Sequence, residues 1–134
     1  MSAQNSRLKI FELQEANSLL PRLEELLSQW EKKHQSFRRF QDHLFFEELM
    51  ADALPSDDGW QELEKLLGTL EEEMAKIHGL GCHLRHAERG MVDFLSRRGE
   101  EWVYYCWRRG EKEIQYYHGL KGGFFERRPL AAVI

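Results

Sequence analysis

At 134 residues, with a net charge of −4 and 42% hydrophobic against 31% charged residues, the chain has the size and composition of one globular domain. This composition excludes a disordered chain, and no stretch approaches the ~18 consecutive apolar residues that a membrane-spanning helix needs. The first residues lack the apolar core of a secretory signal, and the two cysteines, Cys82 and Cys106, are too few for a disulfide framework. We therefore expect a single cytoplasmic domain over residues 1–134, with both thiols reduced and no membrane contact.

The first predicted element is a long helix over residues 12–53. Its apolar residues recur every seven positions, which keeps one stripe facing a partner helix as in a coiled coil. Pro21 lies about two turns from the expected start, where it removes a backbone donor and clashes with the preceding turn. We expect either a kink at Pro21 or a helix that starts near Leu20.

A second helix is predicted over about residues 60–77. Residues 54–59 are rich in helix breakers, and Asp58 followed by Gln61 resembles a capping box. Gly79 and Gly81 supply the stop. The short loop makes the two helices an antiparallel hairpin over about residues 12–80.

The predicted helices differ in length, and this difference bears on assembly. The second helix can cover only the later half of the first, which leaves the apolar stripe of residues 19–30 without a partner. Soluble monomers rarely expose so large an apolar patch. The pattern therefore predicts a homodimer formed through the helices, unless the C-terminal region covers the stripe.

From Met91 onward the hydrophobic period changes from 3.6 to 2, which indicates strands. Three short runs rich in aromatic and β-branched residues lie at 91–95, 102–107 and 114–118, within a small antiparallel β-meander over about residues 88–130. A two-residue type II′ turn at Gly110-Glu111 would oppose Val103 to His118, on the face away from Cys106. The predicted fold is α+β: a long antiparallel helical hairpin followed by a three-stranded meander.

Motifs near both ends of the chain occur together in one known family. They are Glu15-Ala16-Asn17, Leu19-Leu20-Pro21-Arg22-Leu23, Arg89-Gly90-Met91-Val92-Asp93-Phe94, Val103-Tyr104-Tyr105-Cys106-Trp107-Arg108, Gly110-Glu111, His118, Gly123-Phe124, Arg127 and Pro129-Leu130. In these motifs the chain resembles a small bacterial family known only as domain of unknown function 2203. The chain departs from the family pattern at His86, Leu95, Tyr117 and Gly119, and residues 35–75 carry no motif. The resemblance implies a bacterial source and supplies no information on activity.

Charge is unevenly divided between the two parts. Residues 1–82 carry 9 Lys and Arg against 16 Asp and Glu, whereas residues 83–134 carry 10 against 7. Most of the second group are arginines, whose planar fork suits carboxylates and phosphates. We favour pairing of these arginines with acidic side chains, because an excess of three positive charges is small for a nucleic-acid binder. Nucleic acid is therefore not the expected partner, and a basic patch for nucleic acid or another polyanion is the alternative.

Five polar residues near predicted strand ends and turns form the candidate ligand site: Arg89, Asp93, Glu111, His118 and Arg127. In a pocket between meander and helices, opposite charges and a histidine could bind an anionic or zwitterionic ligand. The structural alternative is that Arg89–Asp93 and Arg127–Glu111 are ion pairs that hold the turns. The glycine segment 119–123 is a weaker candidate for an anion, since it lacks the strand-to-helix context of a phosphate loop.

The residues able to bind a soft metal are Cys82, His83, His86, Cys106 and His118. Zinc needs about four such ligands converging on one point, and no paired spacing motif is present. Because the predicted register turns Cys106 and His118 to opposite faces, we expect no metal, no other cofactor and no Cys–His nucleophile pair. The absence of a catalytic motif favours a non-enzymatic, self-associating interaction module that presents the arginine-rich meander to a protein partner. The alternative is a ligand-binding or catalytic protein that uses the five-residue site.

Overall fold

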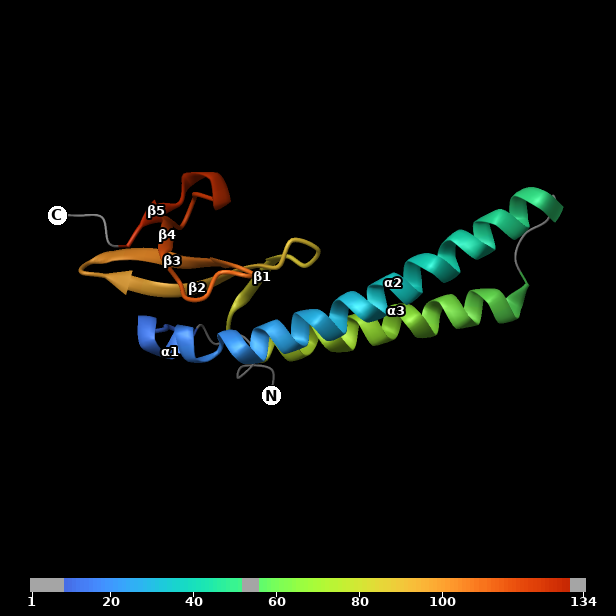
Figure 1. Cartoon of the computed structure of the whole chain (residues 1–134), viewed down its shortest axis with the longest axis horizontal. Helices are drawn as coiled ribbons and strands as arrows, with labels where there is room; N and C mark the ends of the chain where they lie inside the picture. The colour runs from blue at the N-terminus through green and yellow to red at the C-terminus, as the bar shows by residue number, and fades with distance from the viewer. Residues whose placement is uncertain (1–8, 52–55, 131–134) are drawn as a thin grey trace. The chain divides into compact units, whose positions relative to one another are not determined.

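The computed structural model describes residues 9–51 and 56–130, which form helices followed by an antiparallel sheet, an α+β fold (Figure 1). Two compact units are present, one made of residues up to 25 together with 77 onward, the other of residues 26–76. Among the described residues no helix has the length and apolar character needed to cross a membrane. The elements are α1 (Leu13–Ser18), α2 (Leu20–Ala51), α3 (Asp57–His78), β1 (His83–His86), β2 (Met91–Arg98), β3 (Glu101–Arg108), β4 (Tyr116–Gly119), the 3₁₀ turn η2 (Phe124–Glu126) and β5 (Arg128–Pro129).

The predicted first helix is two helices. The Leu19 N–H donates to the Ala16 carbonyl at 3.1 Å and closes α1, after which α2 starts at Leu20. Pro21 is then the second residue of α2, where a missing N–H costs no hydrogen bond. The predicted start near Leu20 is confirmed, and the predicted end at residues 52–53 lies outside the described residues.

Helix α3 begins three residues earlier than expected. The Ser56 hydroxyl accepts a hydrogen bond from the Gly59 N–H at 3.2 Å, in the manner of an N-cap. Asp58 therefore lies inside the helix, and the capping box predicted from Asp58 and Gln61 is wrong. The helix ends at His78, directly before the predicted glycine stop.

Within residues 26–76, α2 and α3 run side by side in opposite directions (Figure 1). The Lys33 ammonium lies 2.6 Å from the Glu73 carboxylate, which also accepts from Lys76 at 3.1 Å. The hydrogen bond from Lys33 outweighs the effect of burial and lowers the pKa of Glu73. A carboxylate only 2% exposed is thus kept charged by two lysines.

The apolar stripe at residues 19–30 is largely buried within the single chain. Leu20, Leu23, Leu26 and Leu27 are each at most 4% exposed, and Trp30 is 6% exposed. The homodimer prediction depended on an exposed stripe, and this stripe is not exposed. The homodimer itself stays a prediction. Exposed large apolar side chains lie instead on the last turns of α2 and the first half of α3: Phe45, Phe46, Leu49, Met50, Trp60 and Leu67.

The sheet has five antiparallel strands in sequence order, so the prediction of three strands is wrong. The two missed strands, β1 and β5, are the edges. Strand β1 has the sequence His-Leu-Arg-His, which shows no apolar alternation, and β5 is two residues that include Pro129. Edge strands tolerate such sequences because one side of their backbone needs no partner strand.

One face of the sheet forms the core of the first unit. Phe11 packs edge-on against Phe94 with ring centroids 5.2 Å apart, and its backbone N–H donates to the Leu95 carbonyl at 2.8 Å. The Asn17 side chain accepts from the Ile114 N–H at 2.8 Å and fixes α1 against the chain that precedes β4. The buried residues of this face are Val92, Phe94, Val103, Tyr105, Trp107 and Ile114.

The pairing of β3 with β4 differs by one residue from the prediction. Cys106 pairs with Tyr116 and Tyr104 pairs with His118, whereas the predicted type II′ turn opposes Val103 to His118. Because side chains alternate with a period of two, a slip of one residue turns a whole strand over. His118 therefore lies on the same face as Cys106, contrary to the prediction.

The cause of this shift is the connection between the two strands. The Glu111 N–H donates to the Arg108 carbonyl at 3.0 Å, so Arg109 and Gly110 are the central residues of the turn. Gly110 has φ 102° at the second central position, which is the requirement of a type II turn rather than type II′. Residues 112–115 then extend the connection before β4 begins.

Gly90 is expected to tolerate no side chain. It has φ 64°, and a Cβ there would lie 2.5 Å from the Arg109 Cβ. We expect Gly90→Ala to lower the free energy of unfolding by about 1–3 kcal/mol, because a left-handed backbone and a close contact are both penalised. The control is Gly68→Ala in α3, where nothing lies within 4 Å of the added Cβ and helix propensity predicts a gain of about 0.5–1 kcal/mol. Urea unfolding of both variants checks this, and equal stabilities would contradict it.

Candidate functional site

Three buried side chains with chemically distinct donor atoms meet on the outer face of the sheet, the face opposite Phe11 and α1. They are Asp93 from β2, Cys106 from β3 and His118 from β4. Asp93 and Cys106 are direct cross-strand partners. One donor atom from each of the three residues lies within 4.8 Å of the other two. The geometric reason for expecting no metal, that Cys106 and His118 face opposite sides, is therefore wrong.

His118 is held through both ring nitrogens. Nε2 lies 3.0 Å from Asp93 Oδ2, and Nδ1 lies 2.7 Å from the carbonyl of Gly119. Both neighbours are hydrogen-bond acceptors, so a neutral ring can donate to only one of them.

Arg85 is the ion-pair partner of Asp93. Its Nε donates to Asp93 Oδ2 at 2.9 Å, and its guanidinium lies 4.8 Å from the centre of the Tyr104 ring. Burial opposes the charged guanidinium, but the Asp93 carboxylate outweighs it and raises the pKa of Arg85. The predicted pair of Arg89 with Asp93 is wrong, since Arg89 is exposed and its backbone N–H donates to His86 Nδ1. Arg85 reaches Asp93 because β1, which was not predicted, pairs with β2.

The other predicted pair is present. Arg127 Nη1 lies 3.1 Å from Glu111 Oε2, and the guanidinium stacks at 4.1 Å on the rings of both Tyr116 and Phe124. Glu111 Oε1 also accepts from the Arg108 N–H at 2.9 Å. Glu111 and Arg127 thus connect the β3–β4 turn to the C-terminal segment, in agreement with the ion-pair alternative.

Neither cysteine has the environment of a nucleophile. Burial, reinforced by the Asp93 charge, raises the pKa of Cys106 to about 12, and burial raises the pKa of Cys82 to about 11. A base that could activate Cys106 would have to face its sulfur, but both His118 nitrogens are directed to oxygens of Asp93 and Gly119. Cys106 is therefore held as a neutral thiol in the folded chain.

Both thiols are expected to resist modification in the folded protein. At pH 8 a thiol with these pKa values is ionised in about one molecule in a thousand or fewer, and only the thiolate reacts. Ellman's reagent should therefore label neither Cys82 nor Cys106 in native buffer, and both in denaturant. Rapid labelling of one thiol under native conditions would contradict the burial of that residue.

A pocket of about 290 Å³ opens over the cluster. Asp93 and Cys106 contribute to its wall, Arg85 stands at one side, and Gly122 packs close to His118 because a Cβ on Gly122 would lie 3.5 Å from the His118 Cβ. The other lining residues are Met91, Leu120, Gly123 and Phe124. Asp93 and His118 therefore meet on the outer face of the sheet, not between meander and helices as expected.

The glycine segment 119–123 is not arranged to bind an anion through its backbone. The Gly122 N–H donates to the Gly119 carbonyl at 3.0 Å, and the Gly123 N–H donates to the Glu126 carboxylate. These donors are already used within the loop. At the site, this glycine segment places backbone atoms close to His118.

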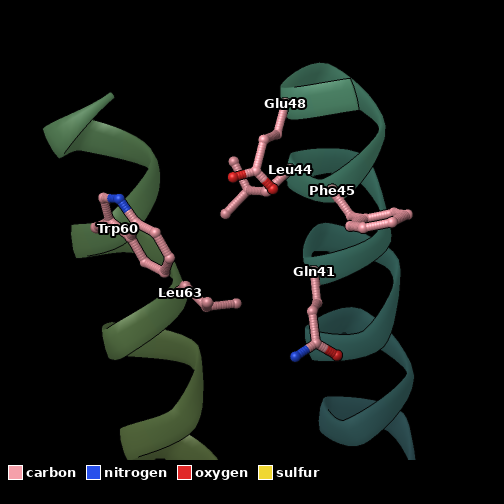
Figure 2. Close-up of a pocket in the computed structure, with 6 residues that line it drawn as sticks. All are labelled: Gln41, Leu44, Phe45, Glu48, Trp60 and Leu63. Carbon is pink, nitrogen blue, oxygen red and sulfur yellow. The ribbon is translucent and has the colours of Figure 1, made fainter. Parts of the chain in front are cut away.

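A second hollow lies in the helical unit, near the loop between α2 and α3. Figure 2 shows Leu44 and Leu63 projecting into the space between the helices, whereas the Phe45 ring points away from α3. The hollow has about 180 Å³ and is lined also by Gln41, Glu48 and Trp60. Its lining is mostly apolar, with no cluster of groups suited to catalysis.

Sequence reasoning found Asp93 and His118 but missed Arg85 and Cys106 as members of one site. The correct β3–β4 register would have identified Cys106, because it shares a face with His118. No local signal could have identified Arg85, since β1 carries no apolar alternation.

Comparison with known proteins returns one family. The family model described as an uncharacterized conserved protein, DUF2203, matches residues 9–130. No curated protein and no solved structure matches the chain.

Proposed function

Because the chain belongs to the DUF2203 family, whose description names no activity, we propose a function from the geometry of the site: the protein binds a small anionic or zwitterionic molecule in the pocket on the outer face of its sheet. The observation that carries the proposal is the pairing of Arg85 with Asp93 at this pocket, with His118 in contact with Asp93 beneath the lining. These charged and titratable groups stand among apolar walls, as is usual for sites that bind small molecules.

Arg85 is the group that would bind the anion. A guanidinium carries five N–H donors, and Asp93 Oδ2 accepts from Nε. The Arg85 side chain is 46% exposed and lines the pocket, whereas the Asp93 side chain is 5% exposed. The buried carboxylate therefore holds an accessible arginine in one orientation, which lowers the entropy lost when a carboxylate or phosphate binds.

Charged side chains of both signs lie around the pocket. Arg127 and Arg108 lie beside it, each with its guanidinium over the Phe124 ring. Against the three arginines, the neighbouring carboxylates are Asp93, Glu111 and Glu126, the last of which accepts from the Gly123 N–H. The three positive and three negative charges balance, so the accessible Arg85 is the group that would attract an anion. The apolar wall suits a ligand with a short carbon skeleton.

The test is direct binding by calorimetry with inorganic phosphate, succinate and glycine as probes. At least one probe should bind wild-type protein and Arg89→Gln but not Arg85→Gln. Arg89 is the matched control, because it is exposed and does not line the pocket. A ligand at 100 times its Kd should also stabilise the folded protein by about 2.7 kcal/mol. Equal binding by both variants, or no binding of any probe, would reject the proposal.

A non-enzymatic, self-associating module is the second candidate. It is supported by the exposed apolar side chains near the loop between α2 and α3, including Phe45 and Trp60 beside the hollow of Figure 2. Sedimentation from low to high micromolar concentration tests it, with Trp60→Glu as the disrupting variant. A strict monomer throughout would exclude it. Coiled-coil pairing, a cytoplasmic location and a bacterial source stay predictions from the sequence.

A further inference from the structure

We propose that Asp93, Cys106 and His118 bind a divalent transition-metal ion of the zinc class, with the remaining coordination position open to the pocket. The inference goes beyond the anion-binding proposal, because it depends on the donor atoms of these three residues and not on Arg85.

The separation of the three donors fits one ion. Zinc bonds of about 2.0–2.3 Å in a tetrahedron place neighbouring donor atoms about 3.3–3.6 Å apart. His118 Nε2 and Asp93 Oδ2 are 3.0 Å apart, and all three donors lie within 4.8 Å of one another. Small side-chain rotations would therefore close the set around an ion without moving the strands.

The orientation of His118 is that of a metal ligand. Nδ1 faces the Gly119 carbonyl at 2.7 Å, and a backbone acceptor at this nitrogen is the usual second-shell partner that directs Nε2 to a metal. With the proton on Nδ1, the lone pair of Nε2 faces a carboxylate oxygen at 3.0 Å. Two acceptors at this distance repel each other unless a proton or a metal ion lies between them.

The donor types select the class of metal. One thiolate, one imidazole and one carboxylate suit zinc and neighbouring transition metals, whereas magnesium and calcium prefer oxygen ligands. On binding, the Cys106 thiol releases its proton to solvent and coordinates as thiolate, while Asp93 and His118 contribute lone pairs. No oxidation or reduction is involved.

Three protein ligands leave one position for water or an anion. Sites of this kind are typical of zinc that binds exchangeable ligands, while structural zinc has four protein ligands. The cluster lies at the wall of the pocket, so the open position would face the space that contains Arg85. On this point the inference is linked to the proposed function: a bound anion would contact both the ion and the guanidinium.

The experiment is a titration of chelator-treated, untagged protein with Co²⁺ as a spectroscopic probe. Wild type should take up one equivalent, with a thiolate-to-cobalt charge-transfer band and the intense visible bands of a four-coordinate ion, and Zn²⁺ should displace it. Cys106→Ser should lose the charge-transfer band. Cys82→Ser should retain it, because Cys82 is equally buried but lies outside the cluster.

The Co²⁺ titration of wild-type protein tests the metal site by itself, whether or not the variants fold. Absence of the charge-transfer band at one equivalent of Co²⁺, or an unchanged band in folded Cys106→Ser, would overturn the inference in favour of a doubly protonated His118 paired with Asp93. Calorimetry with inorganic phosphate on the chelator-treated protein separates the two proposals. Phosphate binding that depends on Arg85 without any metal uptake would reject the metal site and leave the anion pocket.

Discussion

Asp93→Ala is expected to lower the free energy of unfolding by about 3–5 kcal/mol, the cost of removing one partner from a buried ion pair. Asp93 Oδ2 accepts from Arg85 Nε at 2.9 Å and lies 3.0 Å from His118 Nε2. Without the carboxylate, His118 stays 2% exposed and loses one of its two polar neighbours. The exposed part of Arg85 can be hydrated instead, so most of the loss comes from His118.

The matched control is Arg89→Ala. The sequence predicted that Arg89 and Asp93 would act as a pair, so that either substitution would destabilise the protein. Because Arg89 is exposed and Asp93 pairs with Arg85, we expect Arg89→Ala to change stability by less than about 0.5 kcal/mol. Urea unfolding of the two variants measures both effects. A loss below 1 kcal/mol for Asp93→Ala, or similar losses for both, would show that the buried cluster does not stabilise the fold.

Trp107→Ala is expected to have an effect of comparable size, about 3–5 kcal/mol, because it removes a large side chain from the core. Trp107 is 0% exposed and lies opposite Val92 in the β2–β3 ladder. Its Nε1 donates to the Glu111 carbonyl at 2.8 Å and so holds the β3–β4 turn. The substitution therefore creates a cavity and also releases the turn that determines the β4 register.

The control is Trp102, a second tryptophan on the same strand, which shows what the loss of a tryptophan outside the core costs. It is 38% exposed and packs against the Arg97 guanidinium at 4.9 Å from its ring centre. A cation–π contact at an exposed site contributes about 0.5–1 kcal/mol, so Trp102→Ala should cost about 1 kcal/mol. Thermal or urea unfolding monitored by circular dichroism compares the two variants. Losses of equal size would contradict the assignment of Trp107 to the core.

The parts of the fold that depend on local chemistry could be predicted from the sequence. Pro21 predicted either a kink or a helix start near Leu20, because proline lacks the N–H that an interior position must donate, and the structure shows the start. The run of aromatic and β-branched residues at 102–107 predicted the β3 strand. These features need only the few residues around them, so a single sequence contains the necessary information.

The site depended on pairings that no local pattern encodes. Asp93 and His118 were recognised as candidates from their chemistry, but their neighbours were decided by strand register and by an edge strand. A turn centred on Arg109 and Gly110 moved β4 by one residue and brought His118 to the face of Cys106. Successive side chains of a strand point to opposite faces of the sheet. A shift of one residue in register therefore changes which side chains meet on each face. The sequence by itself thus singled out Asp93 and His118 as candidates, and only the tertiary structure decided that Cys106 and Arg85 lie beside them.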